Sequence, residues 1–213
     1  MTPTNPEVYD PIEEVIGTVE AIYGLNSDIT PEAIEVSYPP RDLPEGAMVT
    51  RMAPSPTGEM HIGSVYAALA CAGLAKTSNG KFFLRIEDTD TGREVKGAAA
   101  GIVDLLHQFD IQIDEGPQIR GEYGQYTQSE RAAIYQTFAL DMVKQGKAYI
   151  CFASQEELDS IAAEQERLGV TKGCYGEWSI WRNAEPERVL EEIQKGTPFV
   201  IRLKNDTVPG QST

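Results

Sequence analysis

The 213-residue sequence predicts an α/β fold: the first half of a parallel β-sheet, an inserted α+β part and an N-terminal helical extension. Strand and helix patterns alternate between residues 47 and 116, as in parallel sheets with right-handed crossovers. A proline-rich run at 38–46 separates this region from the extension. We therefore expect three parts: residues 1–46 (extension and linker), 47–116 (half-sheet) and 117–213 (insertion, incomplete).

The extension contains the start signal of a helix. Asp10 is a typical N-cap, Pro11 suits the first helical position, and Glu13 stands three residues after the cap. Apolar residues then recur at helical spacing, which predicts a helix over 11–23. Thr30-Pro31-Glu32 indicates a second, shorter helix.

The half-sheet region has strand, turn and helix patterns in succession. Its first helix is apolar or small on nearly every side, as expected of a helix that packs against several neighbours. The predicted elements are strand 47–53, turn 54–60, helix 62–78, turn 79–80, strand 81–86, helix 96–109 and strand 110–113.

The last part has the pattern of an α+β region. Ser154 and Glu157 form a capping box, which marks the start of one helix. The predicted elements are a polar loop 117–128, helix 130–145, strand 148–152, helix 155–168, loop 169–184, helix 186–195 and strand 198–204.

Composition limits the partners and the compartment. The net charge of −15 argues against nucleic acid as a partner of the whole surface, although a local basic patch remains compatible with it. No apolar run reaches the length of a membrane span, and the N-terminus lacks a signal-peptide pattern. Three cysteines form no disulfide framework. We expect a cytoplasmic protein that does not contact a membrane.

The most specific segment is the turn 54–63 between the first strand and its helix. Its glycines allow close approach of a ligand, and the helix start offers free N–H groups to phosphate. His61 stands at that opening, where an imidazole donor can stabilise charge on a transferring phosphoryl group. The alternative is that His61 is an ordinary capping residue.

These residues resemble the first signature of class I aminoacyl-tRNA synthetases of the glutamate type, in bacterial form. The resemblance extends from about Leu43 to Lys204, and the linker 38–49 is similar to an extension in one bacterial subgroup. The matching blocks are VTRMAPSPTG (49–58), HIG (61–63), GKF (80–82), RIEDTD (85–90), DEGP (114–117), QSER (128–131), GKAY (146–149) and PFVIRLK (198–204).

The resemblance implies a Rossmann-like catalytic sheet, an acceptor-binding insertion and a glutamate–tRNA ligase activity. ATP, accompanied by Mg²⁺, would activate glutamate to glutamyl-adenylate, and the glutamyl group would pass to tRNA(Glu). The family also implies a monomer for the full-length protein.

The family's glutamate contacts fall on four residues. Arg51 would bind the side-chain carboxylate of glutamate, because a guanidinium offers a bidentate fork. Ala53 and Ser55 would shape the same pocket, and Glu87 would face the substrate ammonium. The alternative for Glu87 and Asp88 is an acidic cluster that caps a helix, which spacing alone does not exclude.

The remaining family contacts divide between ATP and the tRNA acceptor end. Thr57, His61 and Gly63 match the ATP contacts, with His61 and Gly63 as the catalytic positions. The family's acceptor-end contacts fall on Thr89, Asp90 and Arg93.

Two departures from the family pattern lead to further expectations. The zinc ligands of many relatives are incomplete, since only Cys151 and Cys174 remain and a structural site needs four ligands, so we expect no zinc. A Lys-Met-Ser-Lys-Ser loop and an anticodon-binding domain are also absent from the sequence, which favours an inactive fragment. Two alternatives stay open: a truncated paralogue that attaches glutamate to a modified tRNA base, against which the incomplete zinc ligands argue, and a non-catalytic binding module. The reading frame after Thr213 would discriminate them.

Overall fold

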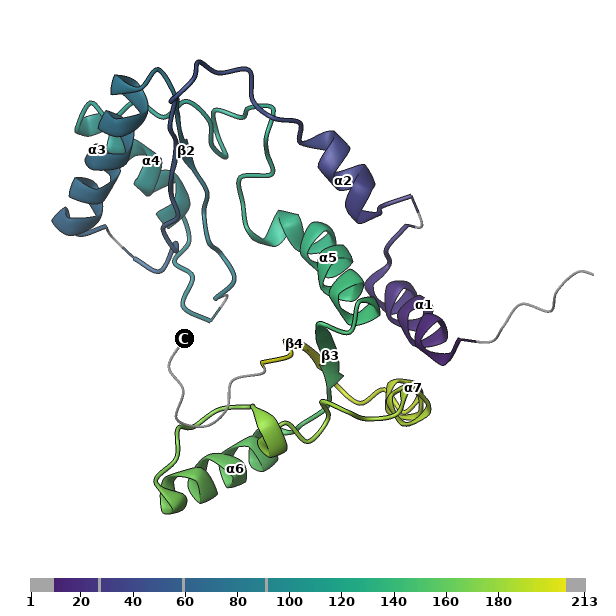
Figure 1. The fold of residues 1–213 in the computed structure, drawn as a ribbon. Helices are drawn as coiled ribbons and strands as arrows, with labels where there is room; N and C mark the ends of the chain where they lie inside the picture. The colour runs from purple at the N-terminus through teal and green to yellow at the C-terminus, as the bar shows by residue number, and fades with distance from the viewer. Residues whose placement is uncertain (1–9, 27, 59, 91, 206–213) are drawn as a thin grey trace, which may run out of the picture. The chain divides into compact units, whose positions relative to one another are not determined.

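The computed structural model describes residues 10–26, 28–58, 60–90 and 92–205 (Figure 1). The chain divides into two compact units, Met1–Ala33 with Tyr135–Thr213, and Ile34–Ile134. Each unit has a hydrophobic core of its own, and all predicted site residues belong to Ile34–Ile134. The predicted domain boundaries at 46 and 116 stay a prediction.

Two parallel strands form the centre of the unit Ile34–Ile134. Strand β1 (Val49–Met52) pairs with β2 (Lys81–Leu84), with Arg51 opposite Phe83. Helix α3 (Ile62–Thr77) connects the two strands. The predicted βα-β unit and its parallel sheet are therefore confirmed, although both strands are shorter than predicted.

The parallel ladder continues past the ends of the assigned strands. The amide of Arg85 donates to the carbonyl of Met52 at 3.0 Å, and the amide of Glu87 donates to the carbonyl of Pro54 at 2.9 Å. These two bonds keep the turn after β1 beside the segment after β2. The ends of both strands consequently reach the same edge of the sheet.

One face of this pair is covered by α3 and α4 (Ala98–Gln108), which lie on the same side of β2 in Figure 1. Their apolar side chains bury Phe82 and Leu84, whereas Lys81 and Phe83 are only half-buried. The buried residues of this core are Val65, Ala68, Ala75, Phe82, Leu84, Ile86, Ile102, Val103, Leu106, Ile111 and Ile113. The predicted helix 96–109 is thus present with slightly shorter bounds.

The predicted strand 110–113 is wrong. Asp110 has a positive φ of 54°, and the amide of Ile111 closes the end of α4 on the carbonyl of Leu106. The chain meets β2 only afterwards, at an isolated parallel bridge between Phe83 and Glu115. Ile111 is nevertheless buried, so the apolar pattern reported burial and not strand pairing.

Gly80 is required where the chain enters β2. A Cβ atom at this position would lie 1.9 Å from the backbone oxygen of Met48, closer than any real contact. The amide of Gly80 also donates to the carbonyl of Ala75 and so ends α3. Only glycine lets β1 and the end of α3 approach each other in this way.

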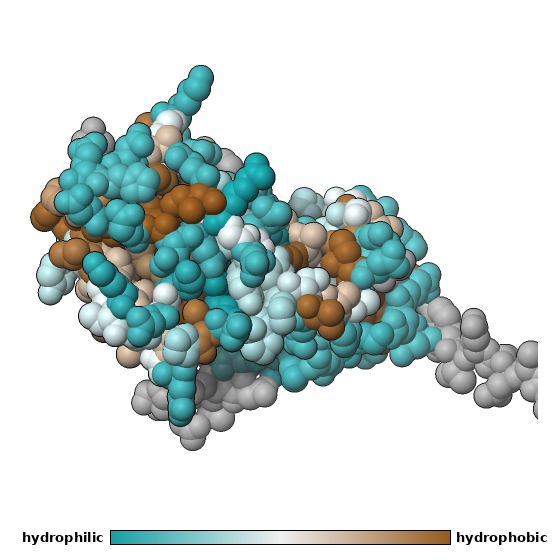
Figure 2. Space-filling model, turned by 90° about the horizontal axis from the view of Figure 1, so that it is seen from above, coloured by the Kyte–Doolittle hydropathy of each residue, from teal (hydrophilic) through white to brown (hydrophobic). Residues whose placement is uncertain are grey.

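Helix α3 also carries exposed apolar side chains. Ile62, Leu69 and Leu74 are all at least half-exposed on its other face, and Tyr66 is 73% exposed. Figure 2 shows brown, apolar residues at the surface on the side where α3 lies in Figure 1. Apolar residues on every side of this helix therefore do not mean burial on every side.

The second unit combines the first helix with the later part of the chain. Its core residues come from the first helix and from helices, a strand and a loop after residue 135, and they include Val15, Val19, Leu140, Ile150, Trp181, Val189 and Ile193. Strands β3 and β4 pair in antiparallel fashion, with Ile150 opposite Ile201. The elements are α1 (Pro11–Tyr23), α5 (Ala132–Lys144), β3 (Ala148–Cys151), α6 (Gln155–Leu168), α7 (Pro186–Gln194) and β4 (Val200–Leu203).

Local capping signals located the helices well. Asp10 accepts from the amide of Ile12 at 3.0 Å, and α1 spans the predicted residues. The predicted capping box of Ser154 and Glu157 is present at the start of α6, which also has the predicted bounds. The short helix expected after Thr30 is α2 (Pro31–Ser37), whereas the predicted helix 130–145 is divided into a 3₁₀ turn, Ser129–Arg131, and α5.

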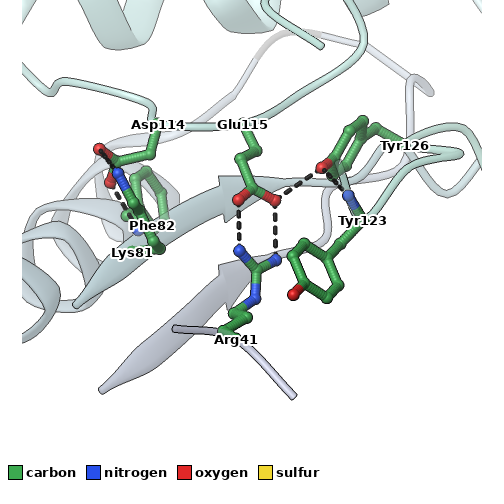
Figure 3. A network of polar contacts seen from close by, with 7 residues as sticks. All are labelled: Arg41, Lys81, Phe82, Asp114, Glu115, Tyr123 and Tyr126. Atoms are coloured by element: carbon green, nitrogen blue, oxygen red, sulfur yellow. Dashed lines mark hydrogen bonds and ion pairs between the residues drawn. The ribbon is translucent and has the colours of Figure 1, made fainter. Parts of the chain in front are cut away.

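A buried ion pair joins Arg41 of the linker to Glu115, which lies beside Phe83 of β2 (Figure 3). Both Nη atoms of Arg41 donate to the Glu115 carboxylate, and the Tyr126 hydroxyl donates to Glu115 Oε2 at 2.6 Å. The bond from Arg41 holds the pKa of Glu115 below its usual range. Burial, together with the bond to Glu115, raises the pKa of Tyr126 to about 12.

The low pKa of Glu115 predicts an acid-sensitive contribution to stability. The contribution is present above the unfolded-state pKa of about 4.3 and is lost as the pH falls through the lower folded-state pKa. We expect Arg41→Met to reduce the free energy of unfolding by about 3 kcal/mol at pH 7, because it leaves a buried carboxylate unpaired. The difference from the wild type should shrink at pH 3 in urea unfolding. An equal difference at both pH values would contradict the assignment.

Candidate active site

Arg51 and Glu87 face each other at the edge where both strands end. Arg51 lies in β1, and Glu87 is placed beside Pro54 by the backbone bond described above. Arg51 Nη1 is 3.6 Å from Glu87 Oε1. The Arg51 side chain is 42% exposed and that of Glu87 is 22% exposed, so a small polar ligand has access to both charges.

Arg85 is a third member of this charge group, and the sequence analysis assigned it no role. Its Nε donates to Glu87 Oε1 at 2.9 Å, and its side chain is only 18% exposed. Arg85 stands two residues before Glu87, the spacing that places side chains on one side of an extended segment. That spacing was the available signal. The Glu87 carboxylate therefore lies between two guanidinium groups and does not cap a helix.

Ala53 and Ser55 follow β1 directly and lie on either side of Pro54. Because Pro54 accepts the amide hydrogen of Glu87, the segment 53–55 runs beside Glu87. Ala53 is half-buried and Ser55 is exposed. The structure thus brings the segments of all four predicted glutamate-binding residues to one edge of the sheet.

His61 is the N-cap of α3. Its Nδ1 accepts from the amide of Gly63 at 3.1 Å, so in the neutral ring the hydrogen is carried by Nε2. Nε2 lies 3.4 Å from the Ser64 hydroxyl, and the ring is exposed. The capping role and the predicted catalytic role are therefore compatible, because the cap leaves the N–H donor on Nε2, beside the Ser64 hydroxyl.

Gly63 makes this arrangement of His61 possible. A Cβ atom at residue 63 would lie 3.0 Å from both Nδ1 and Cε1 of the imidazole. A side chain here would move the ring away from the helix start. Thr57 is exposed in the turn that precedes α3. The amide of Val95, in the loop between β2 and α4, donates to the carbonyl of Pro56 in this turn at 2.9 Å.

The predicted acceptor-end residues form an exposed group after β2. Arg93 Nε donates to Asp90 Oδ2 at 2.6 Å, and the Arg93 side chain is 76% exposed. The bond from Arg93 lowers the pKa of the Asp90 carboxyl. Thr89 is exposed beside this pair, and Asp88 is bound by Ser129, whose amide and hydroxyl donate to it at 2.8 and 2.5 Å.

The described residues contain no group of three or more His, Cys, Asp or Glu side chains arranged to hold a metal ion. Cys151 is buried in β3, and Cys174 is half-buried in the loop after α6. Within the same described ranges, the helices are too short or too polar to cross a membrane.

The site thus combines paired charges at the edge of a parallel sheet with a helix that a histidine caps. This combination is compatible with the class of protein that the sequence resembles. Residues 47–211 match the family described as "tRNA synthetases class I (E and Q), catalytic domain". This match includes most of the chain. The chain belongs to this family.

The most similar relatives include proteins named glutamate–tRNA ligase. The one from Sorangium cellulosum is 46% identical over 198 residues, which is 85% of this chain and 35% of the relative. That from Acetivibrio thermocellus is 48% identical over 174 residues, 80% of this chain and 32% of the relative. The chain thus spans about a third of the length of these relatives.

Solved structures give the same result. A crystal structure of a glutamate tRNA ligase from Elizabethkingia meningosepticum, described as in complex with its amino acid, is 40% identical and has a TM-score of 0.67. It covers 75% of this chain, which in turn covers 32% of that structure. The predicted family and fold class are therefore confirmed.

Proposed function

We propose that this chain carries the first half of the catalytic domain of a glutamate–tRNA ligase. In the first step, the α-carboxylate of glutamate attacks the α-phosphorus of ATP, pyrophosphate leaves, and glutamyl-adenylate forms. In the second step, a ribose hydroxyl at the end of tRNA(Glu) attacks the activated carbonyl, and AMP leaves. The names of the relatives and the charges at the sheet edge support this substrate class.

The observation that carries the proposal is the opposed pair of Arg51 and Glu87, 3.6 Å apart. Glutamate has one ammonium group and a carboxylate beyond the α-carboxylate that reacts. A guanidinium and a carboxylate on one accessible edge match these two groups. Ala53 and Ser55 border the same place and would set the length of side chain that fits.

ATP binds at the start of α3 in this proposal. The Nε2–H of His61 and the free amides of the helix start donate to phosphate oxygens, and Gly63 leaves room for the ring. Thr57 contributes a hydroxyl from the preceding turn. Mg²⁺ would accompany ATP and would neutralise part of the phosphate charge.

The tRNA acceptor end would contact Thr89, Asp90 and Arg93. Arg93 is the cation of this group, and 76% of its side chain is exposed. Its guanidinium is paired with Asp90, and this pair would open when Arg93 binds phosphate. We further propose that the full-length protein acts as a monomer in the cytoplasm, away from membranes.

Arg51→Ala tests the glutamate site. In the protein that contains the whole catalytic domain, kcat/KM for glutamate should fall about 10³-fold, because the substrate carboxylate loses its charge partner. Arg167→Ala is a matched control, since Arg167 pairs with Glu164 on the exposed surface of α6. The measurement is tRNA aminoacylation. A loss below about tenfold for Arg51→Ala would remove Arg51 from the site.

Residues 1–213 alone should not form glutamyl-adenylate at a measurable rate. Several converging donors stabilise a transferring phosphoryl group, and the sequence has no lysine loop of the Lys-Met-Ser-Lys-Ser kind. The measurement is ATP–pyrophosphate exchange with glutamate and tRNA present. Robust exchange by the 213-residue chain would show that it is catalytically complete.

Purified protein should contain well under one zinc ion per chain. Cys151 and Cys174 offer two thiolates, whereas Ala153 and Gly176 cannot supply the other ligands that a structural site needs. Elemental analysis after dialysis measures this directly. One zinc per chain would mean that other residues complete the site.

A further inference from the structure

The linker before β1 is bound to the loop 117–128. The Tyr38 hydroxyl donates to the carbonyl of Gly124 at 2.7 Å. Arg41 adds the two-bond pair with Glu115, and its guanidinium lies 3.8 Å from the centre of the Tyr123 ring. Figure 3 shows the Arg41 guanidinium against the Glu115 carboxylate, with the Tyr123 ring beside it.

Glu115 transmits this attachment to Tyr126. Glu115 is 8% exposed, so its carboxylate needs a cation and hydrogen-bond donors to remain ionised. Arg41 is the cation, and the Tyr126 hydroxyl is a further donor. The same hydroxyl accepts the amide hydrogen of Tyr123 at 3.2 Å, which fixes the ring of Tyr126 on both sides of its oxygen.

Tyr126 in turn begins a short segment that lies beside the residues next to Glu87. The amide of Ile86 donates to the carbonyl of Tyr126 at 3.0 Å, and the amide of Gln128 donates to the carbonyl of Ile86 at 2.8 Å. Ser129 then holds the Asp88 carboxylate through its amide and hydroxyl. Segment 126–129 therefore binds both neighbours of Glu87.

Glu87 is thus positioned from two sides. Its own amide is bound to Pro54, at the end of β1, and its two neighbours are bound to segment 126–129. The distance between its carboxylate and Arg51 depends on both attachments. Only the second of them continues through buried polar groups to the linker.

We propose that Arg41 is a positioning residue for Glu87. It acts through Glu115 and Tyr126, which hold segment 126–129, and it thereby sets the place where the substrate ammonium binds. The inference rests on the proposed function, because glutamate is the ligand. The family match begins at residue 47, so Arg41 lies outside it.

Substitution of Arg41 would change ligand affinities differently if its role were purely structural than if it positions Glu87. Destabilisation of the whole unit would weaken every ligand of the sheet edge to a similar extent. Displacement of Glu87 alone would weaken ligands that have an ammonium group and spare those that lack one. Glutarate has two carboxylates and no ammonium, so it provides this comparison with glutamate.

The test is an NMR titration of the ¹⁵N-labelled 213-residue chain with glutamate and with glutarate. In Arg41→Met, the Kd for glutamate should rise about tenfold, which corresponds to the loss of one hydrogen bond between charged groups. The Kd for glutarate should change less than about twofold. Tyr126→Phe keeps the ion pair and should give the same direction with a smaller change. Arg167→Met should change neither Kd. A parallel loss of both ligands in Arg41→Met and Tyr126→Phe would overturn the proposal.

Amide hydrogen exchange on the same samples tests the positioning without a ligand. Relative to the interior of α3, which reports the stability of the whole unit, the amides of Ile86, Gln128 and Ser129 should exchange at least about tenfold faster in Arg41→Met and in Tyr126→Phe. Unchanged exchange at these three amides would overturn the proposal even if binding changed. Wild-type protein that binds neither ligand would instead refute the proposed glutamate site, and the exchange rates would still decide the role of Arg41.

Discussion

The parallel pairing of β1 and β2, continued by the bonds from Arg85 to Met52 and from Glu87 to Pro54, is the constraint on which the site depends. Parallel strands end at the same edge, so two segments about 35 residues apart in sequence deliver their charges to one place. The approach of Gly80 to the backbone of Met48 sets where this pairing begins. A shift of one residue at that point would turn Arg51 toward the opposite face.

The capping role of His61 and its proposed role in catalysis meet at the start of α3. A histidine that accepts an amide hydrogen on Nδ1 has a defined tautomer, and its ring cannot rotate freely without losing that bond. The helix therefore orients the Nε2–H donor before any ligand arrives. The interaction that stabilises the helix would also prepare the proposed site, which explains why the alternative of an ordinary capping residue was compatible with the sequence as well.

Local features were predictable, and distant pairings were not. Caps such as Asp10 and Ser154 act within three residues, so they located α1 and α6 from the sequence alone. The contact of Arg41 with Glu115 joins residues 74 positions apart, and no local pattern indicates it. For residues 110–113 the apolar pattern indicated burial correctly, but strand pairing depends on where the chain reaches β2. The assignment of Arg51 and Glu87 came from resemblance, and their geometry is compatible with it.

The place of α1 has a consequence for synthesis of the protein. Val15 and Val19 of α1 share a core with Val189 and Ile193 of α7, so a helix that leaves the ribosome early packs against one that is made much later. At about 5–20 residues per second, roughly ten to thirty seconds separate the two during translation. During that interval the apolar face of α1 is exposed to solvent or to chaperones. Folding of this unit therefore waits until α7 has been synthesised, whereas residues 34–134 can form their own core earlier.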